Sequence, residues 1–340
     1  MNRDLHAWIA LAPWVLIASV VVAVAGCAVS PGPSPGDRPI TSAEAEAELR
    51  GVIEDVTAAT AFRYGLTDDR GDGMDTAKII PIPEADAFAA VYHTWSESEG
   101  AFHVNLATSA DLLHWTWRQD YARQASQPAI AAASDGGYVL AWEQEPDPIH
   151  LTIAYYATWD DLLAAKATRR IDPPVTTPAC GEGTASIEAA SSTRVDVSFH
   201  YHAGCDLDRE GGGSTDWTTW HAATRPAVDE ALAKAGVTGH MGDRDQIRFR
   251  GHDLTLIEGQ LVRDDVSTWR TFLYDPSTEI AEPVAFKTHA GSVAFSNPTI
   301  TQIRIDGAAA ILVTLYVISE GAADSEGGEL LYYRTIEPAG

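Results

Sequence analysis

The chain has 340 residues, 45% of them hydrophobic and 21% charged, which is typical of a folded globular protein and excludes a disordered or collagen-like chain. It carries 48 acidic and 23 basic residues, so its formal net charge is −25. A field of this sign repels phosphate backbones, and we expect no nucleic-acid partner.

The first 26 residues have the layout of an export signal. Arg3 precedes an uncharged apolar run from Ala7 to Gly26. The run is also long enough to span a bilayer, so its length alone leaves a permanent anchor open. It ends in Val24-Ala25-Gly26-Cys27, which resembles the lipobox of bacterial lipoproteins. We therefore predict a signal peptide over 1–26, lipidation such as palmitoylation of Cys27, and a location on the extracytoplasmic face of a bacterial cell membrane.

Residues 27–41 are rich in Pro, Gly and Ser and are predicted to be a tether, followed by one domain over 42–340. Cys180 and Cys205 are the cysteines left in this domain, and an oxidising location favours a disulfide between them. Two buried free thiols are the alternative. Neither cysteine belongs to a CxxC pair or has a histidine at ligand spacing, so we expect no zinc site.

From residue 75 onward the sequence repeats a unit of short strands and turns, and helices are expected over 43–61 and 227–235. Each unit begins with an apolar strand opened by a polar residue. The five openers are Asp75–Ile80, Gln127–Ile130, Thr184–Ile187, Glu258–Val262 and Asn297–Ile300. Their partner strands are Ala90–Trp95, Tyr138–Trp142, Val195–Phe199, Trp269–Tyr274 and Ile311–Tyr316. In the third unit, the third strand is expected at Trp217–Ala223.

This repetition predicts an all-β fold, a five-bladed β-propeller with short helical insertions. Each unit has two apolar faces and cannot cover them alone, whereas neighbours in a ring cover both. A two-sheet sandwich is the alternative. In a propeller the innermost strands begin near the axis, so polar residues that are distant in sequence are expected to meet at one end of it.

Three segments resemble motifs of five-bladed glycoside hydrolases of family 43 and its relatives. Ser109–Trp115 resembles the segment that closes the first blade, and Ser126–Ile130 with the turn at Asp135-Gly136 resembles the second-blade motif. Glu258-Gly259-Gln260 is similar to the Glu-Gly-Pro segment that carries the general acid of the family. The resemblance covers about residues 75–335 and implies an inverting glycoside hydrolase that acts on an oligo- or polysaccharide.

The resemblance also implies catalytic roles. In the family an Asp that opens the first blade is the base, a Glu that opens the fourth is the acid, and an Asp that opens the third tunes the acid. Asp75 and Glu258 match the first two roles. Thr184 stands where the tuning Asp is expected, and Glu182, two residues earlier, is the candidate for that role. Thr184, and Gln260 in place of the proline, leave a non-catalytic descendant open.

Glycosidic bond cleavage needs two carboxyl groups in opposite protonation states, and a sugar needs stacking faces and hydrogen-bonding groups around them. The candidates for substrate binding are His93, Trp95, Gln127, Trp142, His200, Arg244, Tyr274 and Asn297. No cofactor motif is present, and we predict no metal site, although Asp243 and Asp245 weakly suggest Ca²⁺.

Each candidate also has a structural interpretation. Asp75 follows three other aspartates and could be a solvated loop acid, as could Glu182, while His93, His200 and the tryptophans could be core residues. The alternatives to an enzyme are therefore a glycan-binding propeller and a structural ring that contacts another envelope protein. The sugar, its linkage and the oligomeric state are not predicted.

Overall fold

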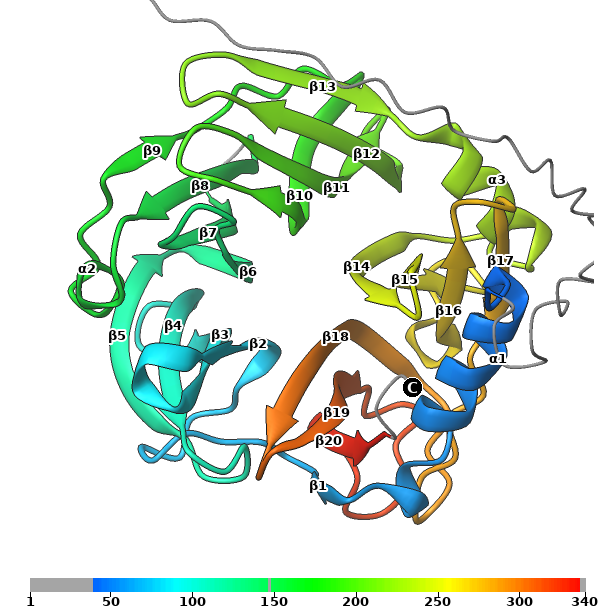
Figure 1. Cartoon of the computed structure of the whole chain (residues 1–340). Helices are drawn as coiled ribbons and strands as arrows, with labels where there is room; N and C mark the ends of the chain where they lie inside the picture. Colours follow the sequence, from blue (N-terminus) through cyan, green and yellow to red (C-terminus); the bar gives the residue numbers. More distant parts are fainter. Residues whose placement is uncertain (1–38, 146–147, 337–340) are drawn as a thin grey trace, which may run out of the picture. The chain divides into compact units, whose positions relative to one another are not determined.

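The computed structural model describes residues 39–145 and 148–336. Five four-stranded antiparallel sheets stand as blades around a central axis (Figure 1). The prediction of an all-β, five-bladed propeller with few short helices is confirmed, and the two-sheet alternative is wrong. The predicted signal peptide, Cys27 and the tether up to residue 38 lie outside the described residues. Within the described ranges, no helix combines the length and apolarity needed to cross a membrane.

The helices are short and the strands make up most of the fold. The helices are α1 (Ser42–Ile53), α2 (Trp159–Leu163), α3 (Pro226–Lys234) and the 3₁₀ turns η1 (Val56–Ala58), η2 (Pro83–Ala85) and η3 (Val266–Thr268). The strands are β1 (Ala61–Arg63), β2 (Asp75–Ile82), β3 (Ala87–Ser96), β4 (Ala101–Ser109), β5 (Thr116–Arg123), β6 (Ala125–Ala132), β7 (Tyr138–Gln144), β8 (His150–Tyr156), β9 (Arg169–Ile171), β10 (Ala179–Ala190), β11 (Val195–Ala203), β12 (Leu207–Thr215), β13 (Trp220–Thr224), β14 (Met241–Phe249), β15 (His252–Gln260), β16 (Trp269–Asp275), β17 (Ile280–Pro283), β18 (Phe295–Ile305), β19 (Ala308–Val317) and β20 (Gly328–Thr335).

Four blades are consecutive in the sequence and the fifth joins the two ends of the ring. β2–β5, β6–β9, β10–β13 and β14–β17 form blades one to four, and their first strands are innermost (Figure 1). The fifth blade consists of β18, β19 and β20 with β1 as its outer strand, in register through Ala61 and Tyr333. Because β1 pairs with β20, the ring is closed by hydrogen bonds between chain-remote segments.

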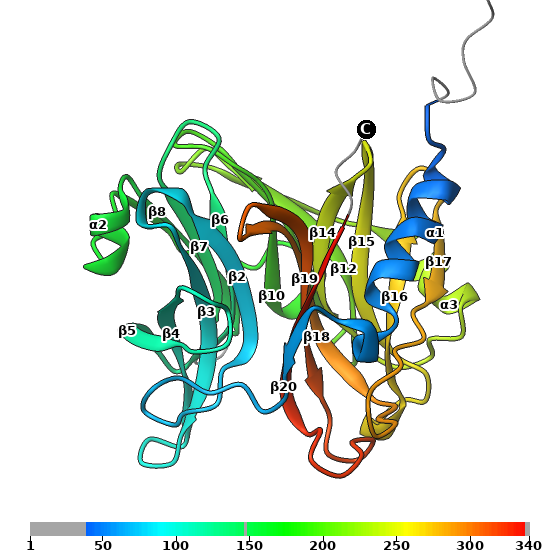
Figure 2. The same cartoon turned by 60° about the horizontal axis from the view of Figure 1, so that its bottom comes forward.

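Apolar side chains fill the spaces between neighbouring blades, as a ring of two-faced sheets requires. One such core joins the fourth and fifth blades and includes Leu49 and Ile53 of α1. Figure 2 shows α1 alongside the fourth blade. The helix begins at a capping box of Thr41 and Glu44 and ends after Ile53, so the predicted helix over 43–61 is too long. α3 agrees with the helix predicted over 227–235.

The innermost strand of the fourth blade differs from the prediction. The segment that opens this blade is β14, which begins at Met241, whereas Glu258 lies near the end of the second strand, β15. The prediction of Glu258–Val262 as the opener is therefore wrong. β14 carries four charged residues within MGDRDQIRF, so the sequence pattern looks polar although most of the strand is buried. The other four predicted openers lie on the innermost strands β2, β6, β10 and β18.

The third blade contains a strand that the sequence pattern did not reveal. β12 includes three consecutive glycines, Gly211 to Gly213, which are poor strand formers, so Trp217–Ala223 was expected to be the third strand instead. That expectation is wrong. The glycines are needed because the side chains of Phe199, Arg225 and Trp220 lie directly against the places where their Cβ atoms would be.

The predicted disulfide between Cys180 and Cys205 is confirmed. It joins β10 to the turn between β11 and β12, and the two Cα atoms are 5.3 Å apart. The bridge therefore fixes a corner of the third blade close to the start of its innermost strand. This is the end of the blade at which Thr184 and His200 lie.

Replacing both cysteines by serine is expected to lower the free energy of unfolding by about 3 kcal/mol, because the bridge closes a loop of 25 residues in the unfolded chain. Urea unfolding of oxidised wild type and of Cys180→Ser/Cys205→Ser measures the difference. Reduced wild type is the matched control and should unfold like the variant. Equal midpoints for the oxidised protein and the variant would contradict the expectation.

Candidate active site at the axial mouth

All five innermost strands are irregular near their first residues. In the first blade, the register between the innermost strand and the second strand shifts between Asp75 and Lys78. The other four blades have a register shift at the equivalent place. In four blades the bulged residue has a left-handed backbone. These residues are Thr76, Gln127, Thr184 and Asn297, with φ of 57°, 50°, 47° and 51°. Such bulges redirect side chains, and here they do so at one end of the axis, which we call the axial mouth.

A chain of hydrogen bonds joins three blades at the axial mouth. Asn297 Nδ2 donates to Thr76 Oγ1 over 2.8 Å, and Thr76 Oγ1 donates to Gln127 Oε1 over 2.9 Å. The backbone N–H of Gln127 donates to His93 Nδ1 over 3.0 Å. Asn297, Gln127 and His93, all predicted to bind substrate, are thus brought together at the mouth, where they connect blades five, one and two. Their role in binding stays a prediction.

The third and fourth blades are joined at the same level by charged groups. Arg244 Nη1 donates to the carbonyl oxygen of Thr184 over 2.7 Å, and Arg244 Nε lies 2.9 Å from Glu210 Oε2. Arg244 and Glu210 are both buried. Arg244 was predicted to orient a substrate, and the structure engages its guanidinium in holding β14 to the third blade.

Below the mouth, the five innermost strands enclose an axial cavity of about 410 Å³. Thr76, Gln127 and Asp243 line the part nearest the mouth. Two residues further along their strands, Lys78 Nζ and Asp245 Oδ2 form an ion pair between the first and fourth blades. Asp245 Oδ2 also accepts the backbone N–H of Ile300 over 2.8 Å, so this pair is fully engaged within the ring.

Asp243 supplies a carboxyl group to the axial site. The sequence suggested this residue only as a weak candidate for a Ca²⁺ ligand. It is the third residue of the innermost strand of the fourth blade, is 7% exposed, and lines the axial cavity. Its buried Oδ2 has no hydrogen-bond partner in the described structure. Burial, opposed by the guanidinium of Arg244, raises the pKa of Asp243 to about 7. A protonated Asp243 is therefore present at neutral pH.

Glu258, the predicted general acid, lies at the axial mouth but on the second strand. Its Oε1 accepts the backbone N–H of Asp243 over 2.9 Å, and its Oε2 accepts that of Asn297. Burial and the charge of Asp243 raise the pKa of Glu258 to about 8. Both oxygens thus connect backbone groups of the fourth and fifth blades, while the predicted catalytic role of Glu258 is untested.

Asp75, the predicted base, opens β2 at the same end of the axis. Its carboxyl group is half-buried, and the described part of the chain offers it no hydrogen bond. Burial raises the pKa of Asp75 to about 6. Its neighbour Glu329 is buried, and its two oxygens accept the backbone N–H groups of Thr76 and Ala77 over 3.2 Å each. Asp75 is therefore the accessible member of this pair.

Glu182, the predicted tuning carboxyl, is directed elsewhere. Its Oε1 accepts the backbone N–H groups of Thr176 and Thr177 over 3.1 Å and the hydroxyl of Thr177 over 2.7 Å. It is buried and stabilises the loop that precedes β10. The carboxyl next to Thr184 is instead Glu143 of β7, whose Oε2 accepts the Thr184 N–H over 3.2 Å. Sequence reasoning missed Glu143.

The predicted aromatic residues divide into two groups. Trp95 is 47% exposed at the end of β3 beyond His93, and it forms an edge-to-face pair with Phe102 at 5.1 Å between ring centroids. Trp142 is 2% exposed and Tyr274 is buried, and both belong to apolar cores. Trp95 thus presents an aromatic face near the mouth, while Trp142 and Tyr274 are core residues.

If the mouth binds a glycan, as the sequence predicts, replacing Trp95 by alanine should weaken that binding by about 1 kcal/mol, roughly fivefold in Kd, because an exposed ring face would be lost. Trp142→Phe is the matched control, and it should lower the melting temperature without changing Kd. Isothermal titration calorimetry and thermal unfolding give the two quantities. Unchanged affinity in Trp95→Ala would remove this residue from the binding face.

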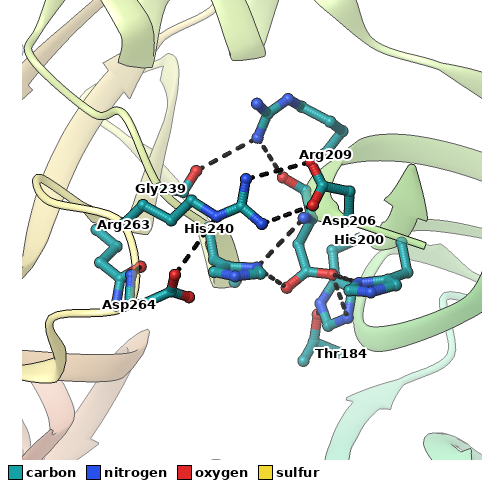
Figure 3. Close-up of polar contacts among 12 residues, drawn as sticks. Thr184, His200, Asp206, Arg209, Gly239, His240, Arg263 and Asp264 are labelled. Carbon is teal, nitrogen blue, oxygen red and sulfur yellow. Dashed lines mark hydrogen bonds and ion pairs between the residues drawn. The ribbon is translucent and has the colours of Figure 1, made fainter. Parts of the chain in front are cut away.

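A cluster of imidazoles borders the mouth between the third and fourth blades. Figure 3 shows His200 next to Thr184, with His240 on the other side of the cluster. Asp208 lies between the rings, with Oδ1 2.8 Å from His202 Nδ1 and Oδ2 2.8 Å from His240 Nδ1. Burial alone would raise the pKa of Asp208, but the neighbouring imidazoles outweigh this effect and lower the pKa. Burial lowers the pKa of His200 to about 4, so its ring is neutral at neutral pH.

The two aspartates that weakly suggested Ca²⁺ are engaged with other groups at the mouth. Asp243 and Asp245 were the candidates for Ca²⁺, but Asp245 is paired with Lys78 and Asp243 packs against Glu258. Within residues 39–145 and 148–336, no three or more His, Cys, Asp or Glu side chains are arranged to hold a metal ion. The pair therefore does not fit a cation site in this arrangement.

No family model and no curated protein matches the sequence, whereas solved structures match the fold. A thermostable family-43 glycoside hydrolase shares 7% identity at a TM-score of 0.53, over 82% of this chain and 94% of its own. An endo-arabinase from Bacteroides thetaiotaomicron VPI-5482 shares 10% at 0.53, over 78% and 95%. An α-L-arabinanase from Penicillium chrysogenum, complexed with arabinobiose, shares 9% at 0.52, over 82% and 98%. These likenesses concern the five-bladed fold.

Proposed function

We propose that the chain is a glycoside hydrolase whose active site is the axial mouth. The observation that carries the proposal is that a half-buried Asp75 and a buried Asp243 with an unpartnered oxygen both lie near the starts of innermost strands, at the same end of the axis. Chain-remote carboxyls in such different surroundings favour opposite protonation states. The fold it shares with an endo-arabinase and an arabinanase supports a carbohydrate as the substrate.

In this proposal Asp75 is the base and Asp243 the acid. Asp75, whose pKa of about 6 leaves it ionised at neutral pH, takes a proton from water, and the water oxygen attacks the anomeric carbon. The bond from that carbon to the leaving oxygen breaks, its electron pair stays with the oxygen, and Asp243 donates a proton to it. Such an inverting reaction needs the two carboxyls roughly 6.5–9.5 Å apart, with water between them.

We assign proton donation to Asp243 rather than Glu258 for two reasons. Both oxygens of Glu258 accept backbone N–H groups, those of Asp243 and Asn297, so this carboxyl is engaged within the ring, whereas Oδ2 of Asp243 has no partner in the described structure. Asp243 also lies near the start of the innermost strand of the fourth blade, the blade in which the family resemblance puts the acid. Glu258 is the alternative donor, and variants of both residues distinguish the two.

Release of sugars from a panel of aryl glycosides and polysaccharides tests the proposal, with Asp75→Asn and Asp243→Asn as the paired variants. Hydrolysis by wild type and its loss in both variants is the expected result. No release from any substrate, together with retained glycan binding in calorimetry, would overturn the enzyme and leave a binding protein.

A glycan-binding propeller without catalysis is the second candidate, and one observation favours it. The opener of the third blade has no carboxyl directed to the mouth, because residue 183 is glycine and Glu182 supports the preceding loop. This function keeps the aromatic face of Trp95 and the hydrogen-bonding groups of the mouth. It predicts binding of oligosaccharides without turnover.

We also propose that a lipid on Cys27 tethers the propeller to the extracytoplasmic face of a bacterial membrane. The lipobox-like residues 24–27 and the Pro- and Gly-rich stretch after them support this location. Labelling with a palmitate analogue in cells tests it. The label should appear on wild type and be absent from Cys27→Ala, and a labelled Cys27→Ala would overturn it.

A further inference from the structure

The carboxyl group of Glu143 occupies space that belongs to another blade. Glu143 lies on β7 of the second blade, and its Oε2 accepts the backbone N–H of Thr184 on β10 of the third. A Cβ on Gly183 would overlap this carboxyl. The glycine therefore makes room for a side chain from the neighbouring blade.

The position of Gly183 in its blade corresponds to that of Asp75. Asp75 pairs with His93 across β2 and β3, and Gly183 pairs with His200 across β10 and β11, each directly before the bulge. At the first blade this position carries its own carboxyl. In the third blade the residue at this position, Gly183, has no side chain. The carboxyl group of Glu143 from the second blade occupies the space instead.

The charged groups around Glu143 are mostly acidic. Burial raises the pKa of Glu143 to about 7, although the hydrogen bond from Thr184 opposes it, and repulsion by Asp243 of β14, Glu145 just after β7 and Asp208 of β12 adds to the increase. His200 also faces this space and is neutral at neutral pH. Repulsion between two carboxylates acts on both, so ionised Glu143 also disfavours loss of the proton from Asp243.

Asp243 has three charged neighbours besides Glu143. Arg244 and Asp245 are next to it on β14, and Glu258 of β15 accepts its backbone N–H. Arg244 favours the ionised form of Asp243, while Asp245 and Glu258 disfavour it. Glu143 approaches β14 from the second blade through Thr184, whose N–H it accepts and whose carbonyl oxygen accepts a hydrogen bond from Arg244, the residue next to Asp243.

We infer that Glu143 supplies the carboxyl that the third blade lacks, as a positioning residue that keeps the proton on Asp243. The inference deepens the proposed function, on which its catalytic meaning rests. The effect on Asp243 itself can be measured without any substrate.

The test is a titration of Asp243 by ¹³C NMR in protein labelled at the aspartate carboxyl carbons, with Asp243→Asn to assign the resonance. In Glu143→Gln the midpoint of Asp243 is expected to fall by about one pH unit, because a like charge is removed while the hydrogen bond from Thr184 can still form. An unchanged midpoint would overturn the inference, whether or not wild type hydrolyses a glycan.

A compensating pair distinguishes this role from packing. Glu143→Ala/Gly183→Asp moves the carboxyl from the second blade to the third. The backbone of Gly183 is outside the left-handed region, and once Glu143 is shortened the new Cβ needs only a small shift of His200, whose Nε2 lies 3.2 Å away. The midpoint of Asp243 should return toward the wild-type value, and the pH profile of any hydrolysis should follow it. A folded double variant whose midpoint stays as low as in Glu143→Gln would contradict the inference. If midpoints shift as expected but wild type hydrolyses nothing, the proposed function alone fails.

Discussion

Asp243→Asn is expected to lower kcat for polysaccharide hydrolysis by about 10²–10⁴-fold, because an amide cannot donate the proton that the leaving oxygen needs. The loss should be much smaller with an aryl glycoside whose leaving group is a weak base, since such a group departs without a proton. Initial rates on both substrates over a range of pH give the comparison. Far-ultraviolet circular dichroism and the melting temperature verify that the variant is folded.

Glu258→Gln is the matched control for the choice of acid. Its amide nitrogen would face a backbone N–H, either that of Asp243 or that of Asn297, so the variant should lose stability. Its ratio of rates on the two substrates should stay that of wild type. If this ratio changes in Glu258→Gln and not in Asp243→Asn, then Glu258 is the acid and our assignment is wrong.

Asp75→Asn should also lower kcat by about 10²–10⁴-fold, but with good and poor leaving groups alike, because activation of water is needed for both. Azide should restore part of the rate, since a small anion attacks without a base. Equal behaviour of Asp75→Asn and Asp243→Asn on all substrates would contradict the separate roles.

The sequence was sufficient to predict the architecture because the propeller repeats the same local pattern. In four of the five innermost strands, a polar residue in the first half of the strand is followed by a mainly apolar run, and a fold of two-faced sheets has few ways to cover such repeats. The disulfide was also predictable, since the domain contains two cysteines and these can pair in one way.

The carboxyl set was harder to predict, because it depends on which blade a side chain enters. Asp243 was concealed by the charged pattern of β14, although the Arg250-Gly251 turn that follows this strand marks a hairpin, as Asp135-Gly136 does in the second blade. Glu143 follows the core residue Trp142, and its place in the sequence predicts the exposed end of a strand. Only the absence of a side chain at residue 183 gives it access to the mouth.

The free energy of unfolding is expected to fall by several kcal/mol between about pH 5 and about pH 8. Burial raises the pKa of Glu143 and Asp243 to about 7 and of Glu258 to about 8. In the unfolded chain these groups titrate near their ordinary values of 4.5 and 3.8. Between these ordinary pKa values and the raised values of the folded state, the folded protein holds protons that the unfolded chain has released.

The sign follows from this difference in bound protons. Stability contributed by these carboxyls is fully present below pH 4 and is lost as pH rises through 7 and 8, at about 1.4 kcal/mol for each unit of pKa difference. Glu326 acts in the opposite direction. Burial alone would raise the pKa of Glu326, but hydrogen bonds from Ser292 and Thr288 lower it to about 2. The stability that Glu326 contributes is therefore lost only in strong acid. The stability maximum is therefore expected at mildly acidic pH.

Urea unfolding at pH 5, 6, 7 and 8 measures this slope, and two comparisons identify its origin. The net charge of −25 also destabilises the fold as pH rises, but 0.5 M salt screens that repulsion and acts much less on buried groups. Asp243→Asn cannot ionise at residue 243, so it should flatten the slope at either salt concentration. A slope that disappears in salt and is equal in Asp243→Asn would mean that surface repulsion, and not the buried carboxyls of the axial mouth, sets the pH dependence.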